Sequence, residues 1–297
     1  MKTDKLMLCV IALMLLFTIA AATAADAPIL TFKFTKVDIP GALETHTNGV
    51  NNAGVMVGSY RNQRSEHGYI LDGKKLTKLD VPKSQQNSTI ANGLNPNGAI
   101  SVVGVYNTPD GVPFGFLYKN GKYTDIPGPK GALQSSANSI NDSGAIVGWY
   151  VDSNEVMHGF LLQGKKYTTL DVPGATEGTL AMGINKRGWI VLYGYTSTSA
   201  ISVLSKNNGK TYRTINVPGA VASFANDLDT AGDVVYEWLD SSHAAHGALL
   251  QAGKYYKFDY PNAVFTYGGG INDKSTIVGW YQISNTGPVS GYKATYK

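Results

Sequence analysis

Two ionisable side chains, His46 and Asp227, interrupt columns of otherwise similar residues in this sequence, and two more, Glu44 and Glu177, stand just before the segments that carry such columns. Imidazole and carboxyl groups can move protons in general acid–base catalysis, and they can also ligate a metal ion. If the four side chains meet in one pocket, an enzyme is the natural interpretation. If they are scattered or bonded into the framework, that interpretation loses its only support.

Other catalytic signatures are missing from the sequence. It contains no G-x-S-x-G, no H-E-x-x-H and no pair of cysteines with metal-binding spacing, so no catalytic residue or cofactor is predicted. His67, His158 and His246 share one position in alternate repeats. Because this position lies on the third strand of each repeat, away from the centre of the predicted ring, metal–ligand bonds of about 2 Å cannot join the three side chains to one ion. We expect each histidine to form a hydrogen bond within its own repeat. Trp189 occurs once and is a candidate for stacking on a sugar or a partner.

The elements that position these residues come from an internal repeat. One anchor, N-x-x-G, recurs every 43 to 46 residues, and a second, D-x-P, keeps the same period in another phase. A fixed period in the forties is typical of propellers, solenoids and arrays. The first anchor begins at Asn51, Asn95, Asn141, Asn185, Asp229 and Asn272, and the second at Asp38, Asp80, Asp125, Asp171, Asn216 and Asp259.

Each repeat divides into four short strands. In the third repeat we predict strands over residues 135–140, 145–150, 158–162 and 167–171, with the Asn141 turn between the first two. Pro173 ends the fourth strand, and proline is tolerated at sheet edges, so this strand should be outermost and the first strand innermost. In the fifth repeat, Glu237 is aligned with Gly148 of the third.

The two ends of the chain indicate a closed ring. Residues 31–39 resemble a fourth strand that precedes any N-x-x-G turn, whereas the last repeat ends without a D-x-P. The N-terminal strand should therefore join the last repeat. We predict an all-β fold, a six-bladed β-propeller of four-stranded antiparallel blades.

Innermost strands line the channel of a propeller, so their columns are candidate ligand sites. Six positions before each turn stands a hydroxyl, and three positions before it usually stands an amide. These groups either satisfy backbone atoms or form a polar ring for a neutral ligand, water or an ion. The hydroxyls are Thr45, Thr89, Ser135, Thr179, Ser223 and Thr266. The amide column holds Asn48, Asn92, Asn138 and Asn226 with Met182 and Gly269, and its asparagines join the four ionisable residues as predicted ligand contacts at a channel mouth.

The N-terminus resembles a secretory signal. Lys2 and Lys5 precede an apolar stretch, residues 6–20, and small residues lie before Ala25. We predict a signal peptide over 1–24 and a single propeller domain over 25–297; an uncleaved membrane anchor is the alternative. Cys9, the sole cysteine, lies in the apolar stretch, so the mature chain would carry no thiol. The expected location is extracellular or periplasmic, without stable membrane insertion after cleavage.

Charge argues against nucleic acid as a partner. The formal net charge is only +4, charged residues make up 15% of the chain, and the lysines are scattered without a basic patch. The remaining hypotheses are a secreted binding module for a polysaccharide, surface component or protein, a secreted lyase, lactonase or hydrolase acting at a channel mouth, and a structural surface or matrix protein.

The third repeat resembles a known family. It reads I-N-D-S-G-A-I-V-G-W-Y over residues 140–150, H-G-F-L over 158–161 and Y-T-T-L-D-V-P-G-A over 167–175. This pattern is similar to the HAF-type extracellular repeat proteins of bacteria, and the similarity covers nearly the whole mature chain. The resemblance implies secretion and a repeat fold. It implies no reaction and transfers no catalytic residue.

Overall fold

The computed structural model describes residues 30–85 and 88–297. The predicted signal peptide, with Cys9, lies outside the described residues, as do residues 25–29 of the predicted domain. Thr31–Lys297 form one compact unit, and all of the strands described below lie within it. Within the described part of the chain, no helix has the length and apolar character needed to cross a membrane.

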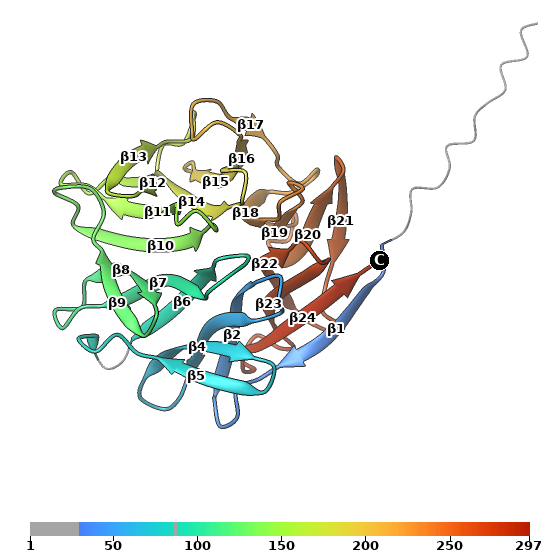
Figure 1. Ribbon diagram of the computed structural model, residues 1–297. Coiled ribbons are helices and arrows are strands. Elements are labelled where there is room, and N and C mark those ends of the chain that lie inside the picture. Colours follow the sequence, from blue (N-terminus) through green and yellow to red (C-terminus); the bar gives the residue numbers. More distant parts are fainter. Residues whose placement is uncertain (1–29, 86–87) are drawn as a thin grey trace, which may run out of the picture. The chain divides into compact units, whose positions relative to one another are not determined.

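The unit is a six-bladed propeller of four-stranded antiparallel sheets, as predicted (Figure 1). Strands run outward from the channel in chain order within each of the first five blades. Blade one holds β2 (Glu44–Val50), β3 (Met56–Arg61), β4 (Glu66–Asp72) and β5 (Lys75–Leu79); blade two holds β6 (Thr89–Leu94), β7 (Ser101–Asn107), β8 (Pro113–Lys119) and β9 (Lys122–Ile126); blade three holds β10 (Gln134–Ile140), β11 (Ile146–Val151), β12 (Met157–Gln163) and β13 (Lys166–Leu170).

The remaining blades follow the same plan, with one difference at the end. Blade four holds β14 (Gly178–Ile184), β15 (Ile190–Tyr195), β16 (Ala200–Ser205) and β17 (Arg213–Thr214); blade five holds β18 (Ala222–Leu228), β19 (Val234–Leu239), β20 (Ala245–Gln251) and β21 (Lys254–Phe258); blade six holds β22 (Phe265–Asn272), β23 (Thr276–Gln282), β24 (Ser290–Tyr296) and, from the other end of the chain, β1 (Phe32–Val37).

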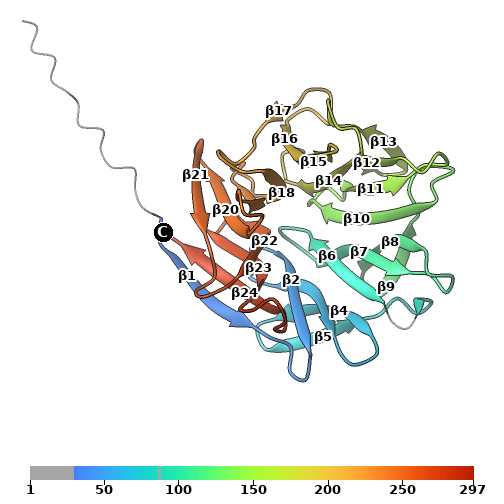
Figure 2. The same cartoon turned by 180° about the vertical axis from the view of Figure 1, so that it is seen from behind.

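Strand β1 is the outermost strand of blade six. It pairs antiparallel with β24, from Phe32 opposite Tyr296 to Val37 opposite Gly291. Figures 1 and 2 show this pairing as a blue strand beside a red one. The ring of Phe34 meets the rings of Tyr260 and Tyr292 at centroid distances of 5.4 and 5.5 Å, so apolar packing reinforces the ladder.

Blades pack face to face through apolar side chains. Between blades four and five, Val191 and Leu204 meet Ala225, Tyr236 and Trp238, all buried. The innermost strands carry small residues where the blades converge, because larger side chains would prevent the close approach of neighbouring strands.

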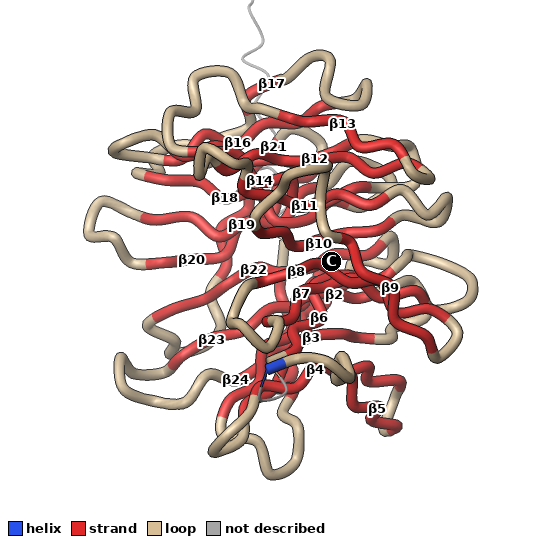
Figure 3. The backbone as a smooth tube through the Cα atoms, turned by 90° about the vertical axis from the view of Figure 1, so that its left-hand side faces the viewer, coloured by secondary structure: helices blue, strands red, loops and turns tan. Residues whose placement is uncertain are grey.

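The connections lie on two faces of the ring, and the strands run between them (Figure 3). We call one the turn face, because it carries the N-x-x-G turns between first and second strands. We call the other the loop face, because it carries the D-x-P loops and the loops between second and third strands. Each innermost strand begins at the loop face and ends at the turn face.

Candidate functional site: the central channel

The hydroxyl column belongs to the framework. The Thr45 hydroxyl accepts a 3.1 Å hydrogen bond from the backbone N–H of Ile39, within the D-x-P loop that precedes its strand. Ser135 differs, because its hydroxyl accepts from Gly115 N–H and donates to the Ile126 carbonyl. The structural interpretation of this column is therefore correct. Equivalent bonds join Val81 to Thr89, Val172 to Thr179, Val217 to Ser223 and Tyr260 to Thr266.

The amide column links neighbouring blades and also faces the channel. At this column every innermost strand shifts register against its partner, as a β-bulge does, and a bulge re-aims the side chain it carries. The Nδ2 groups donate to carbonyls of the next blade. The bonds run from Asn48 to Ala91 (3.1 Å), Asn92 to Ala137 (3.1 Å), Asn138 to Ala181 (3.0 Å) and Asn226 to Gly268 (2.8 Å).

The carboxamide oxygens of these asparagines differ from the nitrogens in their hydrogen bonding. Among the described residues, no group donates to Oδ1 of Asn48, Asn92 or Asn226, and these side chains line the channel. Asn138 Oδ1, in contrast, accepts from the Ser136 hydroxyl at 3.0 Å. The channel therefore presents free hydrogen-bond acceptors without a formal charge.

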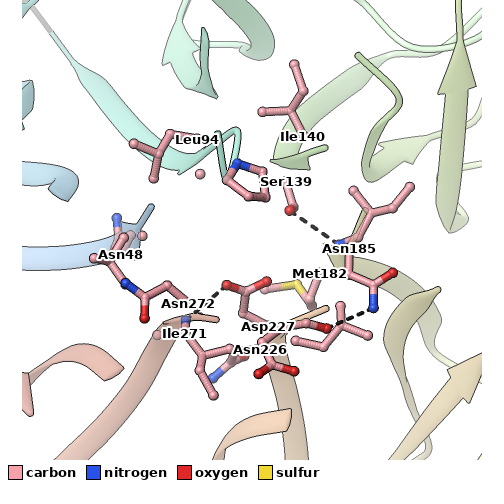
Figure 4. A pocket seen from close by; sticks show the side chains of 18 of the residues that line it. Asn48, Leu94, Ser139, Ile140, Met182, Asn185, Asn226, Asp227, Ile271 and Asn272 are labelled. Atoms are coloured by element: carbon pink, nitrogen blue, oxygen red, sulfur yellow. Dashed lines mark hydrogen bonds between the residues drawn. The ribbon is translucent and has the colours of Figure 1, made fainter. Parts of the chain in front are cut away.

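Two cavities border this amide column. One, of about 120 Å³, extends toward the loop face, where Tyr267 forms part of its wall. The other, of about 50 Å³, extends toward the turn face and includes Asp227 (Figure 4). The second has room for only a few water molecules.

Asp227 connects two blades from inside the channel. Its Oδ2 accepts a 3.1 Å hydrogen bond from Ile271 N–H, as the Ser139 hydroxyl accepts one of 3.3 Å from Ile184 N–H (Figure 4). Burial raises the pKa of the Asp227 carboxyl to about 7. A Cβ atom at Gly183 would come within 2.8 Å of Asp227 Oδ1, so the glycine leaves space for this carboxylate.

The other three ionisable residues lie near the loop face. Glu44 forms an ion pair with Arg61, with one Nε–Oε2 distance of 3.0 Å, and this pairing lowers its pKa. His46 meets Trp280 edge to face at a centroid distance of 5.0 Å, and burial lowers its pKa. Its Nδ1 is buried and has no hydrogen-bond partner among the residues that the structure describes. Glu177 is exposed to solvent.

These four residues do not converge. Glu44 begins its innermost strand, whereas Asp227 occupies the position that Gly49 holds in blade one, about 17 Å further along the strand direction. Of the four, only Asp227 lines either channel cavity. The hypothesis of a catalytic site built from them therefore loses its support.

The sequence alignment placed Glu237 at the position of Gly148, and this assignment is wrong by one residue. Strand register places Tyr236 at the position of Gly148, and Glu237 at that of Trp149, because Ala225 pairs with Tyr236 and Ala137 with Gly148. Glu237 is therefore on the sheet face that carries Phe224, its cross-strand partner. Burial raises the pKa of this carboxyl to about 7. Counting positions from the N-x-x-G anchor, instead of matching residue types, would have assigned Glu237 to the position of Trp149 from the sequence alone.

An aromatic rim surrounds this part of the loop face, formed by Tyr193, Tyr195, Phe224, Tyr267 and Trp280. Phe224 packs on Tyr193 of the preceding blade at 5.3 Å, and Tyr267 stacks on Trp280 at 4.9 Å. Tyr193 is buried, while the other four rings remain partly exposed. Burial raises the pKa of both Tyr193 and Tyr267, and the nearby Glu237 carboxyl adds to both shifts. The rim therefore joins blades four, five and six beside the amide-lined cavity.

The repeated histidines are structural, as predicted. Each Nδ1 lies 2.8 or 2.9 Å from the D-x-P aspartate of its own blade: His67 with Asp80, His158 with Asp171 and His246 with Asp259. Within residues 30–85 and 88–297, no group of three His, Cys, Asp or Glu side chains is arranged to hold a metal ion.

Trp189 does not offer the open stacking surface that we expected from its sequence. Lys206 Nζ lies 3.7 Å from its ring centroid and the Arg187 guanidinium 5.1 Å away. Its edge also packs on the core between blades four and five, where a Cβ at Gly232 would come within 2.7 Å of the ring. We therefore interpret Trp189 as a residue that packs locally in blade four, which accounts for its occurrence in that repeat alone.

Comparison with known proteins identifies the fold. Neither protein-family models nor curated protein sequences give a match. Among solved structures, TolB from Acinetobacter baumannii superposes with a TM-score of 0.57 at 11% identity, over 81% of this chain and 65% of that one. The SapL1 lectin, in complex with alpha methyl fucoside, gives 0.53 at 10%, over 85% and 93%. A putative gluconolactonase gives 0.51 at 12%, over 90% and 92%. At these identities the likeness shows a shared propeller fold.

Proposed function

We propose that this chain is an exported binding module that holds a saccharide at the loop-face mouth of its channel. The observation that carries the proposal is the position of the aromatic rim beside a cavity with free amide oxygens. Ligand sites commonly combine apolar and aromatic walls with a few well-placed polar groups. Here the partly exposed rings of Tyr267, Phe224 and Trp280 supply the walls.

The polar groups suit a ligand rich in hydroxyls. The Oδ1 atoms of Asn48, Asn92 and Asn226 can only accept hydrogen bonds, and their own nitrogens are held by backbone carbonyls. The blades therefore fix these acceptors in advance, which lowers the entropic cost of binding. A cavity of about 120 Å³ is too small to enclose a whole oligosaccharide, so one terminal unit would enter while the next crosses the rim.

Export is part of the proposal. It is supported by the signal-like segment over residues 1–24, by the resemblance to extracellular repeat proteins and by the absence of cysteine after that segment. Saccharide binding is compatible with the fold, because the structure of the SapL1 lectin, which has a similar fold, is of its complex with alpha methyl fucoside.

We propose binding without turnover. Glycoside hydrolysis generally uses two carboxyl groups on opposite sides of the scissile bond. At this mouth, Glu237 has no ion-pair partner among the described residues, whereas the carboxyl of Glu44 is paired with Arg61. Asp227 lies on the far side of the amide column.

The test is calorimetric titration of the mature chain with a panel of neutral oligosaccharides, including fucosides and glucosides. We expect one member to bind and Tyr267→Ala to weaken that binding at least tenfold. Tyr123→Ala, at the half-buried outer edge of blade two, is the matched control and should leave affinity unchanged. Absence of binding across the panel, or binding that survives Tyr267→Ala, would remove the proposal and favour a protein partner or a structural role.

A further inference from the structure

We infer that Glu237 makes the loop-face mouth selective for a saccharide that carries a positively charged amino group. The inference rests on the proposed function and adds the chemical class of the ligand. It follows from a carboxylate that the fold places beside aromatic rings and that has no partner within the described part of the chain.

Glu237 is the only carboxylate in its column. The equivalent positions on the second strands hold Ser59, Val105, Trp149, Tyr193 and Trp280. Its neighbours across the sheet are Phe224 on one side and Gly247 on the other. Neither residue has a side chain that can donate a hydrogen bond to it. The cross-strand neighbours of Glu237 therefore offer its carboxylate no hydrogen-bond donor.

No cation of the described chain compensates this charge. Glu237 takes part in no ion pair among the described residues, and burial raises its pKa to about 7. Glu44, another acid at this face, has its own guanidinium partner in Arg61. A half-buried carboxylate without a counter-charge is costly, and a ligand ammonium group would remove that cost.

The rings around Glu237 favour the same ligand. Tyrosine and tryptophan faces attract cations through their quadrupoles. Glu237 pairs across the sheet with Phe224, whose ring lies 5.3 Å from that of Tyr193. Burial raises the pKa of Tyr193 and Tyr267, and the charge of Glu237 adds to both shifts. A neutral sugar would gain only hydrogen bonds here, and an acidic sugar would be repelled. The preferred unit is therefore an amino sugar with a free ammonium group.

The experiment compares two probes of equal length, a glucosamine tetramer and an N-acetylglucosamine tetramer, by calorimetry at pH 7. We expect wild type to bind the glucosamine tetramer at least tenfold more tightly. Glu237→Gln should reduce that ratio to about one by weakening the affinity for the glucosamine tetramer. Glu177→Gln, an exposed acid at the same face, should leave the ratio intact. The preference should also weaken as salt is raised.

The outcomes separate this inference from the proposed function. If the acetylated tetramer binds in a manner that depends on Tyr267, and wild type shows no preference for the amine, the inference is wrong and the binding module stands. A preference that survives Glu237→Gln also overturns it. Loss of binding to both tetramers in Glu237→Gln, with an unchanged melting temperature, would instead assign Glu237 a general role in binding and overturn amine selectivity.

Discussion

The Asp227 carboxylate of blade five accepts a 3.1 Å hydrogen bond from the backbone N–H of Ile271 in blade six. The Ser139 hydroxyl makes the corresponding contact between blades three and four. Asp227 breaks the pattern of its column, yet it links two neighbouring blades in the same way as the smaller Ser139 side chain does elsewhere in the ring. Its charge, in contrast, is unique to blade five and has consequences for stability.

The first prediction concerns that charge. Because burial raises the folded-state pKa of Asp227 to about 7 from an unfolded value near 3.8, its contribution is most favourable below pH 3.8. It is lost as pH rises through about 7. Asp227→Asn keeps an acceptor for Ile271 and removes the charge. At pH 8 the variant should gain on the order of 2 kcal/mol in free energy of unfolding, and almost nothing at pH 4. Urea unfolding at both pH values measures this, and an equal gain at both would contradict it.

The second prediction concerns the amide column. Asn138→Ala removes the 3.0 Å bond to the Ala181 carbonyl and leaves that carbonyl in the crowded centre of the ring. We expect a loss of about 1–3 kcal/mol in the free energy of unfolding, measured by urea denaturation. An unchanged midpoint would show that water replaces the amide at no cost.

Met182 offers the converse change in the same column. Methionine cannot donate to the next blade, whereas an asparagine there would reach toward the carbonyl of Ala225, as Asn138 reaches that of Ala181. Met182→Asn should therefore stabilise the fold by up to about 1 kcal/mol. Thermal unfolding of the single variant is the measurement, and destabilisation would mean that Met182 contributes more by packing than an amide link could.

The third prediction distinguishes the contribution of the Thr179 hydroxyl to stability from the contribution of the side-chain volume. This side chain is 2% exposed and accepts a 2.9 Å bond from Val172 N–H. Thr179→Val preserves shape and leaves the N–H unpaired, so we expect a loss of about 1–3 kcal/mol. Thr179→Ser keeps the acceptor and should lose less. If both variants unfold at the same denaturant concentration, the hydrogen bond contributes nothing measurable.

The fourth prediction concerns the strand shared between the two ends of the chain. Phe34 on β1 packs on Tyr260 and Tyr292 of blade six. Phe34→Ala should lower the free energy of unfolding by about 2 kcal/mol, since the side chain is half-buried. Thr35→Ala, exposed on the same strand, is the control. Limited proteolysis should cut the N-terminal strand faster in Phe34→Ala alone; equal rates in the two variants would argue against ring closure through this contact.

Local chemistry allowed the sequence to determine the architecture. Turn geometry at Asn141-Asp142-Ser143-Gly144 and the proline after each fourth strand depend on neighbouring residues, so their sixfold recurrence predicted blades, strand order and the outer edge. Alignment on the N-x-x-G turn placed the hydroxyls in one column but left two roles open for them, whereas the separation of the repeated histidines predicted a hydrogen bond within each blade.

The candidate site was decided by the tertiary structure. Tyr193, Glu237 and Tyr267 come from three successive blades, and only the packing of those blades makes them neighbours. Their burial depends on the adjoining blade, which no local pattern encodes. The bulges that turn the amides toward the channel depend in the same way on cross-strand register. Sequence period therefore determines what each blade is, whereas contact between blades determines which side chains form a site.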